Sequence, residues 1–391
     1  MNLTFNLRWC ATLCVLGFPL AQAQNSSLTV LTVGLLAPLS GPHRAVGADM
    51  IGGVKLCLKE TQPELTRLGL SLKLQSYDDG SDNSVAGVRA SQMLKTPGLV
   101  VALGSYSSSV TLTAGSLFAP AKLALIAPSS TGVNVDSVGL GTSNIVRLVP
   151  RADALGGAYV SFLREQLGVK SVHLVQDSSE DAAPLIGKVS DELRRQGLRL
   201  AGFNRVQGSA DYALVVAALQ KTQPDAVFYA GSSGLAAGIV RAMRSAKLSA
   251  VFIGGDSLTE PNFKVAAGPA SSGVYLGTVS VPLALSKATK ALAAAYLVQF
   301  KTEASGYSVL GYDACRVAVD ALKRVAGKSG GQQPTRAQVL VAVRSGALEK
   351  LLSGEVRFDA RGERVQSSFF INQYGSDAVL RLVKVVAVGA K

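Results

Sequence analysis

The distribution of apolar and polar residues predicts short buried strands that alternate with amphipathic helices. Residues 28–36 (LTVLTVGLL) form an apolar run rich in β-branched side chains, and the cluster 37–42 then supplies turn-forming Pro and Gly. Helical spacing follows over 45–60, and strand-like alternation over 70–77. The same order recurs along the chain, with strands expected at 99–103, 123–126, 145–149, 171–176, 199–206, 225–229 and 251–253, and helices at 82–94, from 104–109 onward, 152–167, 182–196, 210–221 and 233–245.

Alternation of this kind is typical of parallel sheets covered by helices on both faces. The units exceed what one compact sheet holds, so the expected fold class is α/β with two doubly wound, Rossmann-like lobes. After 272–282 the pattern changes to helices at 285–303, 308–326 and from Thr335, followed by segments at 355–358, 366–372 and 379–388 that alternate like antiparallel strands.

The lobes are expected to be discontinuous, because the sequence contains no low-complexity linker between them. We predict that lobe 1 comprises 27–149 and about 281–354, and that lobe 2 comprises 150–280 and about 355–391. Three crossovers, near residues 150, 280 and 355, would then act as a hinge.

The N-terminus has the pattern of a secretory signal. In residues 1–23 the one charged residue is Arg8, an apolar run covers 9–20, and Ala21-Gln22-Ala23 provides the small residues that signal peptidase requires. We therefore expect cleavage before Gln24 and a periplasmic mature protein. The alternative is a retained membrane anchor, but the run is shorter than the roughly 20 residues that span a bilayer.

The composition changes this picture little. The chain has 391 residues, of which 48% are hydrophobic and 17% charged, and these values exclude a disordered protein. The net charge of +13 is at first sight typical of a nucleic-acid-binding protein. However, the basic residues are scattered, in pairs such as Arg194-Arg195 and Lys323-Arg324, without interleaved aromatics. An exported chain with this distribution is not expected to bind nucleic acid.

The residues that usually carry catalysis are scarce. Two histidines leave little for a His-based metal site or general base, and the phosphate-binding sequences G-x-x-x-x-G-K-[S/T] and, after a strand, G-x-G-x-x-G are missing. The sequence Gly231–Gly234 (GSSG) lacks the spacing of a strand-to-helix nucleophile elbow. Asp78 and Asp79 suggest a metal or acid pair, but turn capping fits them better without a third ligand. We expect no enzyme, no cofactor and no metal.

Three loops at predicted strand ends carry candidate ligand groups. Ser107–Ser109 stand at a helix N-terminus, Ser129–Thr131 follow a second strand, and Asp256 follows a strand of the second half. Ligands of open α/β sheets bind at these carboxyl ends, and free N–H groups there favour a carboxylate. The lone Asp256 would suit the ammonium of a zwitterion. The alternative is that these side chains only cap helices.

Several segments, in order, also resemble those of one known family. These are 33–56 (VGLLAPLSGPHRAVGADMIGGVKL), 77–79 (YDD), 103–111 (LGSYSSSVT), 125–133 (LIAPSSTGV), 147–156 (RLVPRADALG), 252–258 (FIGGDSL) and 311–314 (GYDA). They resemble the solute-binding proteins of the branched-chain amino acid and amide ABC importers, which have the type I periplasmic binding fold. The resemblance implies a monomer that captures a small amino acid, or a related carboxylate or amide, by cleft closure and delivers it to a membrane permease.

The resemblance also assigns roles to the loop residues. It implies that the Ser108 hydroxyl contacts the ligand carboxylate, that Ser129 contributes through its backbone, and that Thr131 binds through its hydroxyl and amide. Asp256 matches the acid that pairs with the ligand ammonium. These assignments rest on the family pattern and not on the spacing of the residues.

Other positions depart from the family. Val46, Asp181 and Ser232 stand where amino-acid binders often have aromatic residues, which would widen or polarise the pocket. Asp181 could pair with a second polar group of the ligand or simply be a solvated residue near a helix start. Tyr307 is expected either to line the cleft or to pack in the core. His43 is expected mainly in an exposed turn.

Three points stay open at the level of the sequence. The ligand could be an aliphatic amino acid, a small amide or urea-like compound, or an aromatic carboxylate. A ligand-sensing receptor of the same fold is an alternative to transport. Cys57 and Cys315 could form a disulfide in an oxidising compartment, but buried free thiols in two apolar helical patterns are the preferred interpretation.

Overall fold

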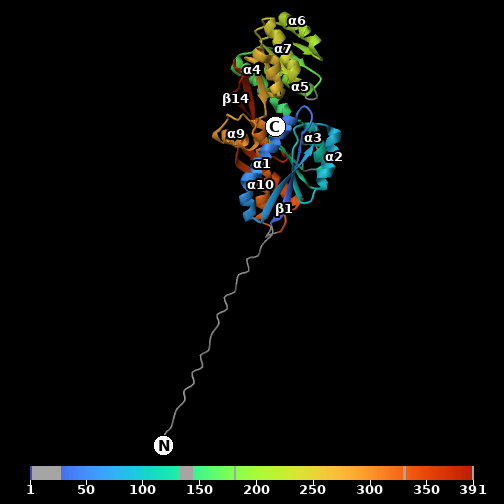
Figure 1. Ribbon diagram of the computed structural model, residues 1–391. Helices are drawn as coiled ribbons and strands as arrows, with labels where there is room; N and C mark the ends of the chain where they lie inside the picture. Colours follow the sequence, from blue (N-terminus) through green and yellow to red (C-terminus); the bar gives the residue numbers. More distant parts are fainter. Residues whose placement is uncertain (2–27, 133–143, 180–181, 329–331, 390–391) are drawn as a thin grey trace.

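The structure is a computed structural model that describes residues 1, 28–132, 144–179, 182–328 and 332–389, so the predicted signal sequence lies almost entirely outside it. Figure 1 shows two lobes, one above the other. Within the described residues the first sheet has five parallel strands, in the order β2 (Leu70–Asp78), β1 (Thr29–Ala37), β3 (Leu99–Leu103), β4 (Ala124–Ala127) and β5 (Ile145–Arg147).

Helices cover both faces of this sheet because its strands are apolar on both sides. Leu35 packs into one core, with α1 (Arg44–Arg67), α10 (Gly306–Ala326) and α11 (Arg336–Arg344). The next residue, Leu36, packs into the opposite core, with α2 (Asn83–Leu94) and α3 (Ser108–Phe118). Continuous apolar strands of this type are typical of parallel sheets that are buried on both faces.

The second sheet is mixed. Its order is β14 (Leu380–Gly389), β13 (Gln366–Tyr374), β10 (Tyr275–Thr278), β9 (Val251–Gly254), β8 (Ala226–Ala230), β6 (Ser171–Gln176) and β7 (Arg199–Arg205). The strands from β7 to β10 in this order all pair in parallel. Strand β13 is antiparallel to β10, and β14 is antiparallel to β13, as the alternation in the sequence predicts. The helices that cover this sheet are α4 (Ala152–Leu167), α5 (Ala182–Arg195), α6 (Tyr212–Thr222), α7 (Ser233–Ser245) and α8 (Pro261–Ala267).

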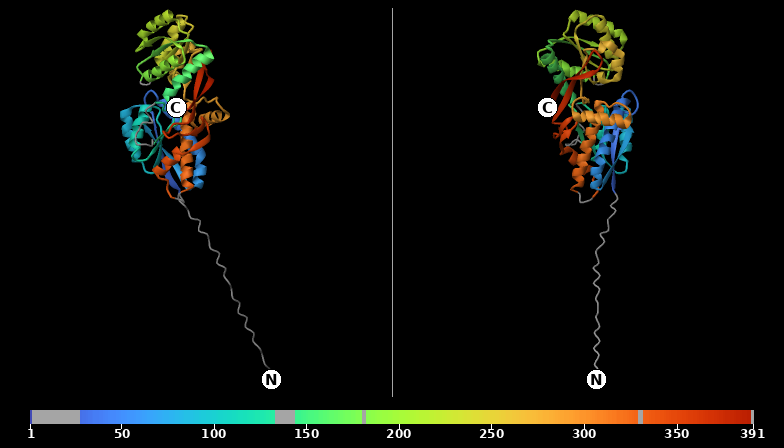
Figure 2. Two further views of the ribbon diagram at one scale, coloured as in Figure 1. Left: turned by 180° about the vertical axis from the view of Figure 1, so that it is seen from behind. Right: turned by 60° about the vertical axis from the view of Figure 1, so that its left-hand side comes forward.

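The chain changes sheets three times. It leaves the first sheet after β5, returns after β10 through α9 (Lys287–Phe300) and α10, and leaves again after the hairpin of β11 (Ala347–Leu351) and β12 (Gly354–Arg357). The two lobes and the lower position of α1 and α10 can be followed in Figures 1 and 2. The predicted α/β class with two doubly wound lobes is therefore confirmed.

Some elements differ from the sequence prediction. Helix α1 continues to Arg67 and contains Pro63, although the pattern ends near residue 60. Its packing along α10 outweighs the loss of one backbone donor at the proline. Strand β10, helix α8 and strand β11 were not expected, since they are short and lie in segments rich in turn residues. None of the helices in the described residues is long and apolar enough to cross a membrane.

A close contact between α1 and α10 joins distant parts of the first lobe. A Cβ atom added to Gly53 would lie 1.9 Å from the Ser308 carbonyl oxygen, so the backbones touch. Further along the same two helices, Cys57 and Cys315 form a disulfide with a Cα–Cα distance of 6.2 Å. The expectation of free thiols was thus wrong. Apolar helical periodicity identifies buried cysteines but does not show that their helices approach this closely.

Candidate functional site

The candidate loops lie at the carboxyl ends of strands in both sheets, as predicted. Ser108 is the first residue of α3, which follows β3, and Ser129–Thr131 follow β4. Asp256 begins a short 3-10 helix, η2 (Asp256–Thr259), after β9 of the second sheet. This is the edge at which ligands of doubly wound sheets bind.

Hydroxyl groups cross-link the two loops of the first lobe. The Ser108 hydroxyl accepts a hydrogen bond from the Gly132 amide at 2.9 Å. The fully buried Ser130 hydroxyl lies 2.6 Å from that of Thr111 and donates to the Ser105 carbonyl at 3.1 Å. The sequence places Ser130 in a candidate ligand loop but does not indicate its pairing with Thr111, because Thr111 is one small polar residue in an otherwise ordinary helix. Together these bonds fix the spacing between Ser108 and the loop that carries Thr131.

A buried arginine binds the backbone of the loop that carries Thr131. Arg147, at the end of β5, is 1% exposed and donates to the carbonyls of Ser130 at 3.1 Å and Gly132 at 2.8 Å. Its guanidinium also forms a salt bridge of 3.0 Å with Glu363, a buried residue between β12 and β13. The one sequence signal for this arrangement is a charged residue at the end of an apolar strand.

Asp256 is a carboxylate with one unsatisfied oxygen. Its Oδ2 accepts a hydrogen bond from the Tyr307 hydroxyl. Its Oδ1 is buried and has no hydrogen-bond partner in the part of the chain that the structure describes. Burial raises the pKa of Asp256, while interactions with Thr278 and Tyr307 lower it and the nearby Glu260 charge raises it further. A buried acceptor oxygen without a partner favours the binding of a hydrogen-bond donor, above all a cationic one.

A row of aromatic rings from the first lobe begins at this carboxylate. Tyr307, on the first turn of α10, is 5% exposed, and its ring meets that of Tyr106 edge to face at 5.6 Å. The Tyr106 ring lies 4.9 Å from the ring of His43. His43 in turn places Nδ1 3.8 Å from Glu260 Oε1 of the second lobe. Tyr307 is thus both packed and in contact with Asp256, and Tyr106 is a site residue that the sequence does not indicate.

The remaining candidates are less directly connected. Val46 is half-buried on the first turn of α1 and packs against the same core as Tyr106. Ser232 is exposed at the N-cap of α7, where its amide donates to Asp177 Oδ2 at 2.7 Å. Asp181 lies outside the described residues. The structure therefore links Ser108 to the loop that carries Ser129 and Thr131, and it joins Tyr307 to Asp256, whereas Ser232 is tied to Asp177.

The paired acids Asp78 and Asp79 stabilise turns, as the capping interpretation expects. Asp78 Oδ1 accepts from the amides of Leu39 at 2.8 Å and Gly80 at 3.0 Å. The fully buried Asp79 accepts from the Ser105 hydroxyl at 2.6 Å, and burial raises its pKa. The described part of the chain contains no group of three or more His, Cys, Asp or Glu side chains that could hold a metal ion.

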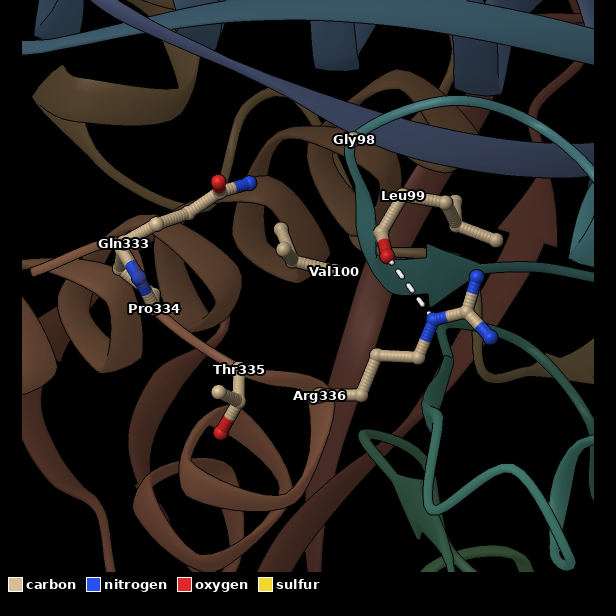
Figure 3. Close-up of a pocket in the computed structure, with 7 residues that line it drawn as sticks. All are labelled: Gly98, Leu99, Val100, Gln333, Pro334, Thr335 and Arg336. Atoms are coloured by element: carbon tan, nitrogen blue, oxygen red, sulfur yellow. Dashed lines mark hydrogen bonds between the residues drawn. The ribbon is translucent and has the colours of Figure 1, made fainter.

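A pocket of about 360 Å³ lies at the other end of β3, away from these loops. Figure 3 shows Arg336 of α11 reaching across it to the Leu99 carbonyl, 3.0 Å from Nε. The same guanidinium donates to the Leu94 carbonyl at 3.0 Å. Arg336 therefore fastens α11 to the start of β3, and the pocket is separate from the candidate site.

Comparisons with known proteins agree with this fold. The profile of a periplasmic binding protein family matches residues 30–378. The "Leu/Ile/Val-binding protein homolog 1" of Brucella abortus (strain 2308) is 24% identical over 87% of this chain and 89% of its own. The "Leu/Ile/Val-binding protein BraC3" of Rhizobium johnstonii is 23% identical over 93% and 95%, respectively.

Solved structures show the same fold. The leucine-binding protein LivK of Thermotoga maritima has a TM-score of 0.76 at 21% identity and covers 91% of this chain and 98% of its own. The protein LivJ of Streptococcus pneumoniae, solved with isoleucine, has a TM-score of 0.77 at 19% identity, with coverage of 93% and 100%. A solute-binding protein of R. palustris, solved with benzoate, has a TM-score of 0.74 at 18% identity, with coverage of 93% and 98%.

Proposed function

The chain belongs to the periplasmic binding protein family, whose members bind solutes and are not enzymes, and on this premise we propose that it captures a small α-amino acid for an ABC importer. It is exported, acts as a monomer and hands its ligand to a membrane permease. A ligand-sensing receptor of the same fold is the alternative role for the same binding site.

The proposal rests above all on the hydrogen bonding of the two carboxylate oxygens of Asp256. Its Oδ1 is buried without a partner in the described residues, while Oδ2 is held by Tyr307. A ligand ammonium would supply the missing donor and compensate the buried charge. The hydroxyls and amides of the Ser108 and Thr131 loops would bind the ligand carboxylate without needing a cation. The two ends of a zwitterion are thus matched by groups from the two lobes.

Binding in this arrangement proceeds by lobe closure. The carboxylate docks on the first-lobe loops, and the second lobe then brings Asp256 onto the ammonium by rotation about the three crossovers. The ligand shifts the open–closed equilibrium by its additional affinity for the closed form. The permease recognises the closed form.

The ligand class is a branched-chain or similar aliphatic amino acid, in line with the names of the relatives. A second candidate is an aromatic carboxylate, because the rings of His43, Tyr106 and Tyr307 form a cluster at the site. The buried Asp256 favours the amino acid, since an aromatic carboxylate without an amine would leave Oδ1 unsatisfied.

A thermal-shift screen of the ligand-free mature protein separates these candidates. Amino acids, aliphatic and aromatic carboxylates, and small amides are tested at the same concentrations. A true ligand at 100 times its Kd adds about 2.7 kcal/mol to the stability. We expect stabilisation by an α-amino acid and none by the corresponding acid that lacks the amine. Stabilisation by benzoate-like acids alone would reject the amino-acid proposal.

The carboxylate half of the site has its own test. The double variant Ser108→Ala/Thr131→Val should weaken amino-acid binding about 10- to 100-fold, because each hydroxyl contributes about 1 kcal/mol or somewhat more to a charged acceptor. Isothermal titration calorimetry measures the change. The control is Ser109→Ala, whose hydroxyl pairs, among the residues that the structure describes, only with that of Ser107 at 2.9 Å and which should change the affinity less than threefold. Wild-type affinity in the double variant would place the ligand elsewhere.

A further inference from the structure

Two crossovers of the chain are fastened to each other beside the ligand loop. The Arg147 amide donates to the Gly362 carbonyl at 2.9 Å, and the Arg147 side chain pairs with Glu363 at 3.0 Å. Arg364 donates to the Leu148 carbonyl at 3.0 Å. The end of β5, where the chain first leaves the first lobe, is thus bound to the segment through which it leaves the second time.

The same arginine reaches the ligand loop on its other side. One guanidinium nitrogen of Arg147 donates to the carbonyls on either side of Thr131, those of Ser130 and Gly132. The Thr131 carbonyl itself accepts from the amide of Ala152, the first residue of α4 in the second lobe, at 2.7 Å. The backbone of the loop is therefore fixed at three successive carbonyls by groups that belong to the crossover.

From these contacts we infer that Arg147 is a positioning residue that couples the ligand loop at Thr131 to the crossover segment at Glu363. The inference rests on the proposed function, since Thr131 is the residue through which it acts on ligand binding. Arg147 does not touch the ligand. It holds the Thr131 amide and hydroxyl in the orientation for a carboxylate, and any movement of the crossover during closure reaches the loop through its guanidinium.

The chemistry of the guanidinium suits this role. It is planar and presents several donors in fixed directions, so one side chain can hold two carbonyls and one carboxylate at the same time. Glu363 neutralises the charge of a side chain that is almost wholly buried. A lysine at this position has a single ammonium and cannot keep all three contacts in the same geometry.

The first measurement needs no ligand. Amide hydrogen exchange at Gly132 and Ala152, whose N–H groups donate to the Ser108 hydroxyl and the Thr131 carbonyl, should be at least ten times faster in Arg147→Lys than in the wild type. The matched control is Arg364→Lys, which changes a buried arginine of the same crossover that contacts Leu148, Ser353 and Glu355 but not the loop. Exchange at the Gly132 and Ala152 amides should change less than threefold in this control. Unchanged exchange in Arg147→Lys would overturn the inference whatever the ligand is.

The second measurement is a double-mutant cycle on affinity for the amino acid identified in the screen. Arg147→Lys should weaken binding at least tenfold in the wild-type background and by a clearly smaller factor when Thr131→Val is already present, because part of the effect passes through the Thr131 hydroxyl. Equal losses in both backgrounds would reject the coupling. Wild-type affinity of Thr131→Val alone would instead reject the proposed carboxylate site, so the two failures are distinguishable. If Arg147→Lys does not fold, Glu363→Gln should raise exchange at the same two amides.

Discussion

Replacement of Asp256 by asparagine should weaken the binding of a zwitterionic amino acid at least ~100-fold. Removing one partner of a buried ion pair costs about 3–5 kcal/mol, because the other charge is left buried and uncompensated. Asparagine keeps the shape of the side chain and an acceptor for the Tyr307 hydroxyl, so the loss reports on the charge. Isothermal titration calorimetry with an amino acid and with its amine-free analogue measures the difference.

The same variant should make the ligand-free protein more stable at pH 7. Burial raises the pKa of Asp256 in the folded state above its unfolded value, so folding favours the protonated carboxyl. That contribution is fully present below the unfolded pKa of about 3.9 and is lost as the pH rises through the higher folded pKa. Asparagine resembles the protonated carboxyl, so it keeps this contribution to the stability at pH 7. The stability gain of Asp256→Asn should therefore disappear in acid, which thermal unfolding between pH 3 and pH 7 measures.

The control for Asp256 is the neighbouring acid of the same lobe. Glu260 accepts from the Ser233 hydroxyl at 2.7 Å and lies 3.8 Å from His43, so both of its oxygens already face partners. We expect Glu260→Gln to change the affinity less than about threefold, the range of a surface ion pair. If Glu260→Gln and Asp256→Asn weakened binding equally, the assignment of the ammonium to Asp256 would be wrong. Equal losses for an amino acid and its amine-free analogue would also contradict it.

Removal of the disulfide should cost about 4 kcal/mol of unfolding free energy. Cys57 and Cys315 are 258 residues apart, and a cross-link that closes so long a loop strongly restricts the unfolded chain. We expect the variant Cys57→Ala/Cys315→Ala to unfold at a clearly lower guanidinium concentration while still binding ligand. Both cysteines are buried between α1 and α10, so the loss includes a small packing contribution.

Reduction provides the matched experiment for the disulfide. Dithiothreitol should destabilise the wild type by a similar amount and leave the double variant unchanged. Mass spectrometry of the mature, alkylated protein should show no free thiol before reduction. Two free thiols in the native protein, or unfolding curves that do not respond to reductant, would contradict the bond between α1 and α10.

For the two cysteines, the sequence predicted burial but not pairing. Their helical patterns correctly indicate that Cys57 and Cys315 are buried, since apolar periodicity is a local property of each segment. Whether the two sulfur atoms meet depends on how α1 crosses α10, and this is decided by Gly53 and Gly311, where neither helix has room for a Cβ atom. No local pattern relates these residues, so the free-thiol interpretation had no signal to correct it.

The site shows the same division. The sequence places Ser108, Thr131 and Asp256 at strand ends, because the strands and helices around them have clear periodicity. The contact of Tyr307 with Asp256 joins the two lobes, and the edge-to-face packing of Tyr106 on Tyr307 joins distant segments of the first lobe. Both become visible only in the tertiary structure.

By itself the sequence determined the α/β class, the order of the elements, the antiparallel strands at the C-terminal end, and the loops that carry hydroxyl and carboxyl groups. The tertiary structure alone decided the disulfide, the unsatisfied oxygen of Asp256, and the connection from Thr131 through Arg147 to Glu363. The physical reason is the range of each signal. Secondary structure follows from interactions among residues a few positions apart, whereas the choice of partners depends on segments that folding brings together, which in the disulfide and the Arg147–Glu363 pair are more than 200 positions apart.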